Sequence, residues 1–228
     1  YETVAPFTAE NGYAMAGSYL NGEVVDSMGG GICQVSTTLY NAVLRAELEV
    51  VERSPHSMTV HYVELSEDAA IAGTYKDFKF KNSTEYPIYI EGYTTSDKKI
   101  TFNIYGKETR DSNRSISFES VLVNEVKPNT ILRDDAGQGL GYKNVSAGKT
   151  GYVAELYKIV KVNGVQTDRI KINKSTYKGS DRVVTYGTAG DPTLSENLRA
   201  AIAAQDEALA DANVAAANAA AAAAAPAQ

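Results

Sequence analysis

The chain has 228 residues, a formal net charge of −6 and a hydrophobic content of 43%. This length predicts one or two domains, and the hydrophobic content is sufficient for a folded core. The acidic balance argues against nucleic-acid binding, because a phosphate-binding surface needs an excess of Lys and Arg. Outside the alanine-rich end, no run of about 18 apolar residues could span a bilayer. Membrane attachment is therefore expected only through a segment upstream of Tyr1.

Reactive side chains are scarce in this sequence, which contains one cysteine, Cys33, and two histidines, His56 and His61. A single cysteine rules out an internal disulfide and a metal site built from several cysteines. The two histidines lack the helical i, i+4 spacing that many zinc ligands show. We therefore predict neither a bound metal nor a cofactor, and nucleophilic or imidazole chemistry has to use these few residues. The sequence leaves the oligomeric state open.

Residues 1–107 combine glycine turns, one helix and several strands. The Asn21-Gly22 pair predicts a small hairpin, since Asn-Gly tolerates the positive φ angles of a tight turn. Three consecutive glycines follow and cannot easily continue a helix, so a helix with one apolar stripe is predicted to begin near Ile32 or Cys33. Alternation then predicts strands at residues 49–53, 57–63, 78–80, 87–93 and 100–105. We expect an α+β domain in which the cysteine-bearing helix packs on an antiparallel sheet.

The rest of the chain divides into a β-rich stretch and an alanine-rich tail. Strands are predicted at residues 115–123, 152–162 and 168–177, and the Asn163-Gly164 pair is a strong hairpin signal. Thr193 and Glu196 have the spacing of a capping box, in front of a tail that is either helical or disordered. The expected parts are therefore an α+β domain over 1–107, an elongated all-β module over 108–190 and the tail over 191–228.

Cys33 lies between the glycine turn and the predicted helix, and it is the first candidate for an active centre. At a helix N-terminus, unpaired N–H groups and the positive end of the helix dipole stabilise a thiolate and lower the pKa of the thiol. A cysteine nucleophile also needs a base, usually a histidine that a carboxylate or amide orients. His56 comes after the helix, and Asp68 and Asp77 follow it. Papain-like and transglutaminase-like folds share this layout.

The same residues also have a purely structural interpretation. A lone cysteine on a core-facing helix is more often a small buried hydrophobic residue than a nucleophile. A loop histidine such as His56 is usually a surface residue, and His61 occupies an ordinary position of a predicted strand, which ranks it below His56. The sequence does not decide between Asp68 and Asp77 as the partner of the histidine.

Four stretches of the first 107 residues carry a family resemblance, namely Thr8–Tyr13, Gly29–Ala42, Pro55–Ser57 and Asp77–Asn82. Together they resemble the VanW family, which is named after an accessory gene of vancomycin-resistance clusters. The resemblance implies an exported cell-envelope protein of a Gram-positive type of bacterium, often tethered at the membrane and paired with peptidoglycan-binding modules. The motif positions that it matches are Cys33, Gln34, Ser36, Thr37, His56 and Asp77.

Residues 115–188 are similar to the G-five domain, an extracellular β module. The matching stretches are Ala147–Gly151, Val162–Val165, Tyr177 and Tyr186–Thr188. This resemblance implies binding to the cell wall or to amino sugars. A rigid spacer is an equally open interpretation, because a fold does not determine a function.

These observations lead to competing hypotheses. In the first, Cys33 attacks an amide or acyl carbon of a peptidoglycan peptide, and His56 is the general base. Asp77 or Asp68 orients His56, and N–H groups at the helix start hold the oxyanion. The residues expected around the ligand are Gly29, Gly30, Gly31, Gln34, Ser36 and Thr37. In the second hypothesis, the protein binds cell-wall peptidoglycan or glycan, or acts as an adhesin, without catalysis. In a third, both domains are a scaffold.

Overall fold

The computed structural model describes residues 1–20 and 23–224, and internal contacts divide the chain into two compact units. The first unit comprises residues 1–125 and 151–178, and the second comprises 126–150 and the chain from 179 onward. The architecture is mixed, with mostly strands and three α-helices in the described ranges. This division by contacts cuts across the expected β module over 108–190, because three strands of that stretch belong to the first unit, one of them except for its last residue.

The first unit holds one long helix and most of the strands. Its elements are β1 (Met15–Leu20), β2 (Glu23–Met28), α1 (Ile32–Arg45), β3 (Glu49–Glu52), β4 (Lys79–Lys81), β5 (Tyr89–Thr94), β6 (Ile100–Tyr105), β7 (Arg114–Val126, whose last residue falls in the second unit), β10 (Gly151–Val162) and β11 (Val165–Tyr177). A short 3-10 helix, Ala9–Asn11, precedes them. β1–β2, β3–β4 and β5–β6 are separate antiparallel pairs, and β10 lies between β7 and β11 in a three-stranded sheet. Several small sheets thus replace the predicted antiparallel sheet.

Two hairpin predictions can be compared with this topology. β1 and β2 pair as the first one requires, with Leu20 opposite Glu23, while the Asn21-Gly22 turn itself lies outside the described residues. β10 and β11 form the second hairpin, in which Asn163 and Gly164 have φ angles of +53° and +79°. A type I′ turn needs positive φ at both central positions, which is why the Asn-Gly pair predicts this hairpin correctly.

The predicted strand over residues 57–63 is wrong. Residues 53–78 form a loop with one isolated β-bridge, between Ala72 and Lys76. The backbone N–H of His56 donates to the carboxylate of Asp68, and the carbonyl of Ser57 accepts from the N–H of Lys178. These backbone groups bond to a side chain and to a residue beyond the end of a strand, and not to a strand partner. The alternation of apolar and polar residues therefore does not indicate a strand here.

A glycine turn sets the start of α1. Gly31 is the N-cap residue and has a φ of +86°, in the left-handed region that favours glycine. A Cβ atom on Gly30 would lie 2.0 Å from the carbonyl oxygen of Ala16, so β1 approaches the turn too closely for any side chain. The helix therefore begins at Ile32, as predicted.

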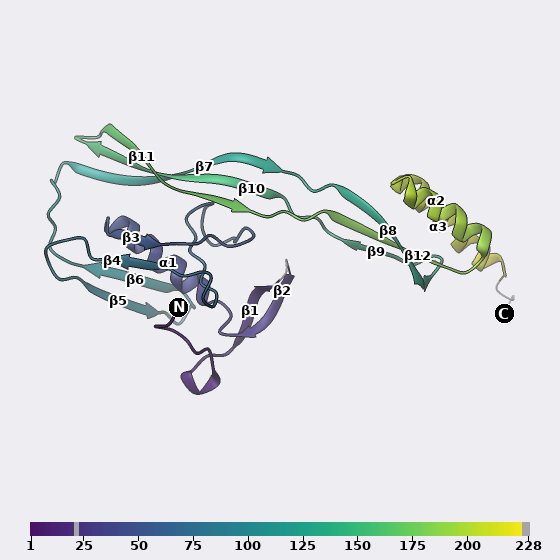
Figure 1. The fold of residues 1–228 in the computed structure, drawn as a ribbon, viewed down its shortest axis with the longest axis horizontal. Coiled ribbons are helices and arrows are strands. Elements are labelled where there is room, and N and C mark those ends of the chain that lie inside the picture. The colour runs from purple at the N-terminus through teal and green to yellow at the C-terminus, as the bar shows by residue number, and fades with distance from the viewer. Residues whose placement is uncertain (21–22, 225–228) are drawn as a thin grey trace. The chain divides into compact units, whose positions relative to one another are not determined.

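The core of the first unit forms around the buried face of α1. Tyr40 and Leu44 of α1 are 1% and 6% exposed, and they cluster with Ala69 of the loop and Leu156 of β10. Half-buried hydrophobic side chains surround this cluster, namely Val50, Phe78, Phe118 and Ile172. Figure 1 shows α1 between the β5–β6 pair and the sheet of β7, β10 and β11. The strands β10 and β11 therefore complete the core of the unit that contains Cys33.

One carboxylate, Glu47, holds the turn that follows α1. It accepts hydrogen bonds from Arg114 at 2.5 and 2.8 Å and from Lys158 of β10 at 2.8 Å, and Arg110 lies 3.3 Å away. The hydrogen bonds, that of Arg114 foremost, lower the pKa of Glu47 to about 2. This ionised side chain ties the end of α1 to β7 and β10.

The second unit consists of a small sheet and two helices. Its elements are β8 (Thr130–Gly139), β9 (Lys143–Ser146), β12 (Arg182–Ala189), α2 (Pro192–Ala203) and α3 (Glu207–Ala224). β12 pairs in parallel with β8 and antiparallel with β9. These three strands are not predicted from the sequence. β9 is fully exposed, so its residues show no alternation between buried and exposed positions.

The alanine-rich tail is helical in its described part and packs on this sheet. Leu198 and Ile202 of α2 are buried in one cluster with Leu132 and Tyr186 of the strands. The predicted capping box is not formed, because Asp191 is the N-cap residue and accepts hydrogen bonds from two N–H groups of the first helical turn. No helix in the described ranges has the length and apolar character needed to cross a bilayer.

We expect Leu156→Ala to lower the free energy of unfolding by about 2–5 kcal/mol, because it opens a cavity beside Tyr40 and Leu44. Urea unfolding followed by circular dichroism measures this loss. The matched control is Leu122→Ala in β7, whose side chain is 51% exposed. The control should change the free energy of unfolding by no more than about 0.5 kcal/mol. Equal losses in the two variants would contradict the role of β10 in the core.

Candidate active site

Cys33 occupies the first turn of α1, as the second residue of the helix, and it is partly exposed. Its S–H group donates to the carbonyl oxygen of Ile71, with a sulfur–oxygen distance of 3.4 Å. The thiol therefore faces the loop 53–78, close to the positive end of the helix dipole. This placement at a helix N-terminus is the one that the sequence predicts.

The loop residues Asp68 to Ile71 are buried beside the first turns of α1. Two helix hydroxyls fix their backbone: Ser36 Oγ donates to the carbonyl of Ala69 at 2.6 Å, and Thr37 Oγ1 accepts from the N–H of Ala69 at 3.0 Å. Ser36 and Thr37 are themselves buried. In this structure they position the loop, whereas the sequence analysis expects them around a ligand.

His56 and Asp68 form the centre of the site. The ring Nδ1 of His56 lies 2.7 Å from Asp68 Oδ2, and the same oxygen accepts the backbone N–H of His56 at 2.6 Å. Both residues are buried, with 8% and 0% exposure. Asp77, the other predicted partner, instead accepts from the N–H of Phe78 at 2.8 Å. The structure thus brings Asp68, and not Asp77, to the histidine.

The second oxygen of Asp68 also has two donors. Oδ1 accepts from Arg53 Nη2 at 2.8 Å and from the hydroxyl of Tyr177 at 2.5 Å. The Tyr177 hydroxyl accepts in turn from the N–H of Ser66 at 2.7 Å. Arg53 Nε donates to the backbone carbonyl of Asp68 at 2.6 Å. A buried carboxylate is costly unless it is paired and hydrogen-bonded, and here four donors meet this requirement.

The three ionisable groups of the site shift one another's pKa. Burial raises the pKa of Asp68, but the hydrogen bonds from His56 and the charge of Arg53 outweigh it, so the pKa is lowered. Burial opposes protonation of His56, yet its hydrogen bonds with Asp68 and Cys33 raise its pKa to about 9. Burial also disfavours a Cys33 thiolate, but the hydrogen bond with His56 and the charges of His56 and Lys76 lower the pKa of the thiol. These directions favour a thiolate beside an imidazolium.

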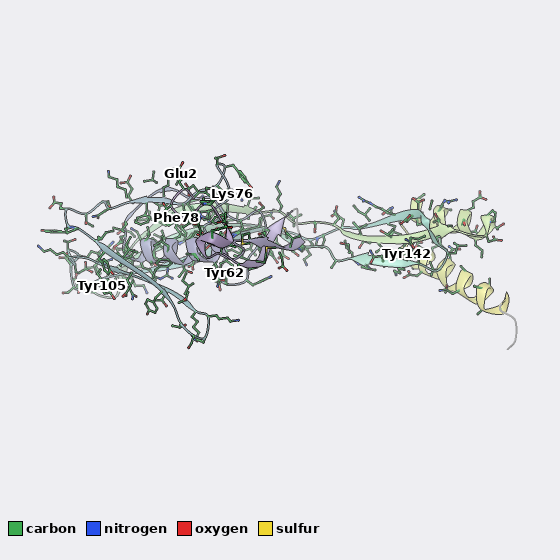
Figure 2. All side chains as sticks on the ribbon, turned by 90° about the horizontal axis from the view of Figure 1, so that it is seen from below. Glu2, Tyr62, Lys76, Phe78, Tyr105 and Tyr142 are labelled. Atoms are coloured by element: carbon green, nitrogen blue, oxygen red, sulfur yellow. The ribbon has the colours of Figure 1, made fainter. Side chains whose placement is uncertain are left out.

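Two more polar side chains, Tyr62 and Lys76, belong to this neighbourhood (both are labelled in Figure 2). The Tyr62 hydroxyl lies 3.4 Å from His56 Nε2, and the two rings meet edge to face at 6.3 Å. Lys76 Nζ donates to the carbonyl of Pro55 at 2.7 Å. Its ammonium group acts on the Cys33 thiol, whose pKa it lowers.

The start of α1 offers N–H donors for a substrate oxygen. The N–H of Ile32 donates to the carbonyl of Gly29 at 3.2 Å, and that of Gln34 donates to the carbonyl of Gly31 at 2.9 Å. Within the described part of the chain, the N–H of Cys33 has no such backbone acceptor. This N–H and the exposed side-chain amide of Gln34 are therefore the donors of this turn that suit an oxyanion. Gly29, Gly30 and Gly31, which are expected around the ligand, form the turn that leads into the helix.

Two cavities of the first unit lie away from Cys33. Two cavities of about 640 and 900 Å³ meet around Arg45, Arg110 and Arg114, near the C-terminal end of α1, and Cys33 lines neither. Over residues 1–20 and 23–224, no three His, Cys, Asp or Glu side chains gather into a potential metal site. The thiol of Cys33 is itself partly exposed.

Sequence reasoning misses four contributors to the site, namely Arg53, Tyr62, Lys76 and the role of Tyr177. Arg53 lies three positions before His56, and this short spacing was the sequence feature that could have identified it. Tyr177 is separated from Asp68 by 109 positions. No local pattern connects two residues at that distance, and only the tertiary fold brings them together.

The chain matches two families. Residues 1–105 match the family described as VanW like protein, and residues 119–189 match the family described as G5 domain. The protein YoaR of Bacillus subtilis (strain 168) is 43% identical over 89 residues, which cover 39% of this chain and 29% of YoaR. The chain therefore aligns with less than a third of the length of this relative.

Two solved structures of G5 domains are similar to about a third of this chain. The G5 domain of IgA1 protease is 22% identical, with a TM-score of 0.27, covering 34% of this chain and 94% of that one. HP0197-G5 is also 22% identical, with a TM-score of 0.21, covering 33% of this chain and all of that one. Both resemblances that the sequence analysis identifies are thus confirmed by the family matches. The chain carries a VanW-like domain followed by a G5 domain.

Proposed function

We propose that this protein is a cysteine-dependent hydrolase or acyltransferase that acts on the peptides of peptidoglycan. A VanW-like domain together with a G5 domain indicates a protein associated with the cell envelope. The catalytic part of the proposal rests on one observation, the 2.7 Å contact between His56 and the buried Asp68 beside a thiol whose pKa is lowered. An extracellular site in a Gram-positive type of bacterium belongs to the same proposal.

The first half-reaction forms an acyl-enzyme. The Cys33 thiolate attacks the amide carbon and forms a C–S bond, while the carbonyl electron pair moves onto the oxygen. The N–H of Cys33 and the side chain of Gln34 stabilise this oxyanion. Because Nδ1 of His56 is bonded to Asp68, Nε2 carries the proton that is transferred. This proton goes to the leaving amine as the C–N bond breaks.

The second half-reaction releases the acyl group. Neutral His56 now removes a proton from water or from an amine, which attacks the thioester carbon, and the C–S bond breaks to restore the Cys33 thiolate. Water gives hydrolysis and an amine gives transpeptidation. A cysteine on a helix and a histidine are also the central groups of papain-like and transglutaminase-like enzymes. The likeness that we propose is one of chemistry.

The second candidate function is non-catalytic binding to cell-wall glycan. Two observations favour it: Cys33 lines neither of the two cavities around Arg45, Arg110 and Arg114, and the chain contains a segment that matches the G5 domain. In this case Cys33 is a packing residue, and replacing it leaves the attachment to cell walls unchanged.

The reactivity of Cys33 towards iodoacetamide should persist well below pH 8.5, because the pKa of an unperturbed thiol is about 8.5. In His56→Ala, the hydrogen bond and the positive charge that lower this pKa are lost, whereas burial still raises it. The midpoint of the pH–rate profile should therefore rise by at least about one unit. His61→Ala changes an exposed histidine and is the matched control. Identical midpoints in wild type and His56→Ala would contradict the proposed thiolate–imidazolium pair.

Purified peptidoglycan offers a direct test of the reaction. The wild type should yield new peptide ends or new cross-links, detected by mass spectrometry of the released fragments. Cys33→Ser should reduce their rate of formation by at least about 1,000-fold, because the alkoxide of a serine has no comparable stabilisation here. The binding function is correct if the wild type forms no products and if equal fractions of the wild type and of Cys33→Ala sediment with cell walls.

Tyr177→Phe tests the positioning of the site by β11. The change removes one donor from Asp68 and leaves the N–H of Ser66 without its acceptor, so the free energy of unfolding should fall by about 1–3 kcal/mol. The Asp68 carboxylate then loses one of the hydrogen bonds that hold it in place beside His56, and Cys33 alkylation at neutral pH should slow several-fold. Tyr157→Phe is the matched control, because its hydroxyl bonds to Glu155 outside the site. Unchanged alkylation in Tyr177→Phe would refute the positioning role.

A further inference from the structure

The outward side of the β5–β6 hairpin carries a row of tyrosines that the candidate active site does not use. The register places Tyr89 opposite Tyr105, Glu91 opposite Asn103 and Tyr93 opposite Thr101. Alternate residues of a strand share one side, so these six form one surface, which we call the tyrosine face. The residues in between, such as Ile90, Phe102 and Ile104, are half-buried on the other side of the hairpin, and β6 contacts α1.

The rings of the tyrosine face are unusually open to solvent. Tyr89, Tyr93 and Tyr105 are 65%, 46% and 52% exposed, and Tyr105 is labelled in Figure 2. The rings of Tyr89 and Tyr105 are nearly parallel, inclined by 28° with their centroids 6.0 Å apart. Such a cross-strand pair stabilises a hairpin by about 0.2–1 kcal/mol. Hairpin stability does not account for the third exposed ring, and grouped exposed aromatic residues commonly mark a binding surface.

Hydrogen-bonding groups lie between these rings. Glu91 Oε2 accepts from Asn103 Nδ2 at 3.0 Å and from the Tyr105 hydroxyl at 3.2 Å. Glu91 and Asn103 are half-buried, so the neighbouring side chains hold them in place. The surface therefore presents a preorganised carboxylate and amide at the same level as the aromatic rings. Tyr105 also lines the cavity of about 900 Å³.

We propose that the tyrosine face binds a chain of neutral pyranose sugars. The C–H side of a β-linked pyranose is apolar and slightly positive, and it stacks on the negative face of an aromatic ring. The hydroxyl groups at the edge of the same sugar donate to a carboxylate and exchange hydrogen bonds with an amide. Tyr89 and Tyr105 thus supply the stacking surface, and Glu91 and Asn103 supply the polar contacts.

The charges of the tyrosine face select against other ligands. It contains one acidic residue, Glu91, and no Lys or Arg among its six positions. A phosphate-rich ligand is therefore repelled. An apolar protein surface would bury the carboxylate of Glu91 without a cation, which is costly. A neutral polyhydroxylated chain incurs neither cost.

This binding site goes beyond the proposed reaction and is independent of it. It lies within residues 1–105, the VanW-like segment, so glycan binding is not confined to the G5 segment. It uses none of Cys33, His56 and Asp68, and it would exist in a catalytic and in a non-catalytic protein alike.

The test uses the whole chain and the β-1,4-linked hexamer of N-acetylglucosamine as the probe. In protein with isotope-labelled tyrosine rings, the NMR signals of Tyr89 and Tyr105 should shift on titration with the hexamer. The double variant Tyr89→Ala/Tyr105→Ala should bind at least about tenfold more weakly, which corresponds to about 1.4 kcal/mol. Added salt should leave the affinity nearly unchanged, because the probe is neutral.

Matched variants make the outcome decisive. Tyr75→Ala removes a tyrosine that is 76% exposed but lies outside the hairpin, and Cys33→Ala removes the candidate nucleophile; both should bind like the wild type. Glu91→Gln keeps both rings and should weaken binding several-fold, so it serves if the double variant does not fold. The proposal is overturned if the hexamer does not bind. It is also overturned if only other tyrosines shift, or if Tyr75→Ala weakens binding as much as the double variant.

Discussion

The buried carboxylate of Asp68 is the constraint on which the rest of the first unit depends. Removing an ionised carboxylate from water costs several kcal/mol unless partners replace the lost hydration. Here the backbone N–H and the ring of His56 occupy one oxygen, while Arg53 and Tyr177 occupy the other. The donors Arg53 and His56 come from the start of the 53–78 loop, and Tyr177 comes from β11. The loop can therefore adopt its irregular course only when β11 is in place.

The same carboxylate determines the electrostatics of the candidate active site. Burial by itself favours the uncharged forms of Cys33, His56 and Asp68. Each pKa nevertheless shifts in the direction that favours the charged form, because Asp68 is hydrogen-bonded to His56 and His56 to Cys33. A charged pair that exists before substrate arrives avoids a proton transfer before the attack. The partly exposed thiol lies at a helix N-terminus and lines neither of the two cavities around Arg45, Arg110 and Arg114.

The family boundaries and the physical units of this chain differ. The VanW-like match ends at residue 105, but the core beneath α1 is closed by Leu156, and Asp68 is held by Tyr177, both from the segment that matches the G5 domain. The β10–β11 hairpin is thus a structural part of the unit that contains Cys33. This explains why contacts assign residues 151–178 to the first unit.

The sequence by itself determined the features that depend on neighbouring residues. The glycine turn sets the start of α1 and thereby puts Cys33 at a helix N-terminus, and Asn163-Gly164 specifies a hairpin, because φ preferences act within a few positions. The motif around Cys33 was also sufficient for the VanW resemblance. Only the tertiary structure decided what depends on distant contacts. It places Asp68, and not Asp77, beside His56, and residues 57–63 form a loop. Ser36 and Thr37 hydrogen-bond to the backbone of that loop at Ala69, and Arg53 and Tyr177 donate to Asp68. A buried charge is satisfied by whichever donors the folded chain brings within hydrogen-bonding distance, and local pattern carries no information about them.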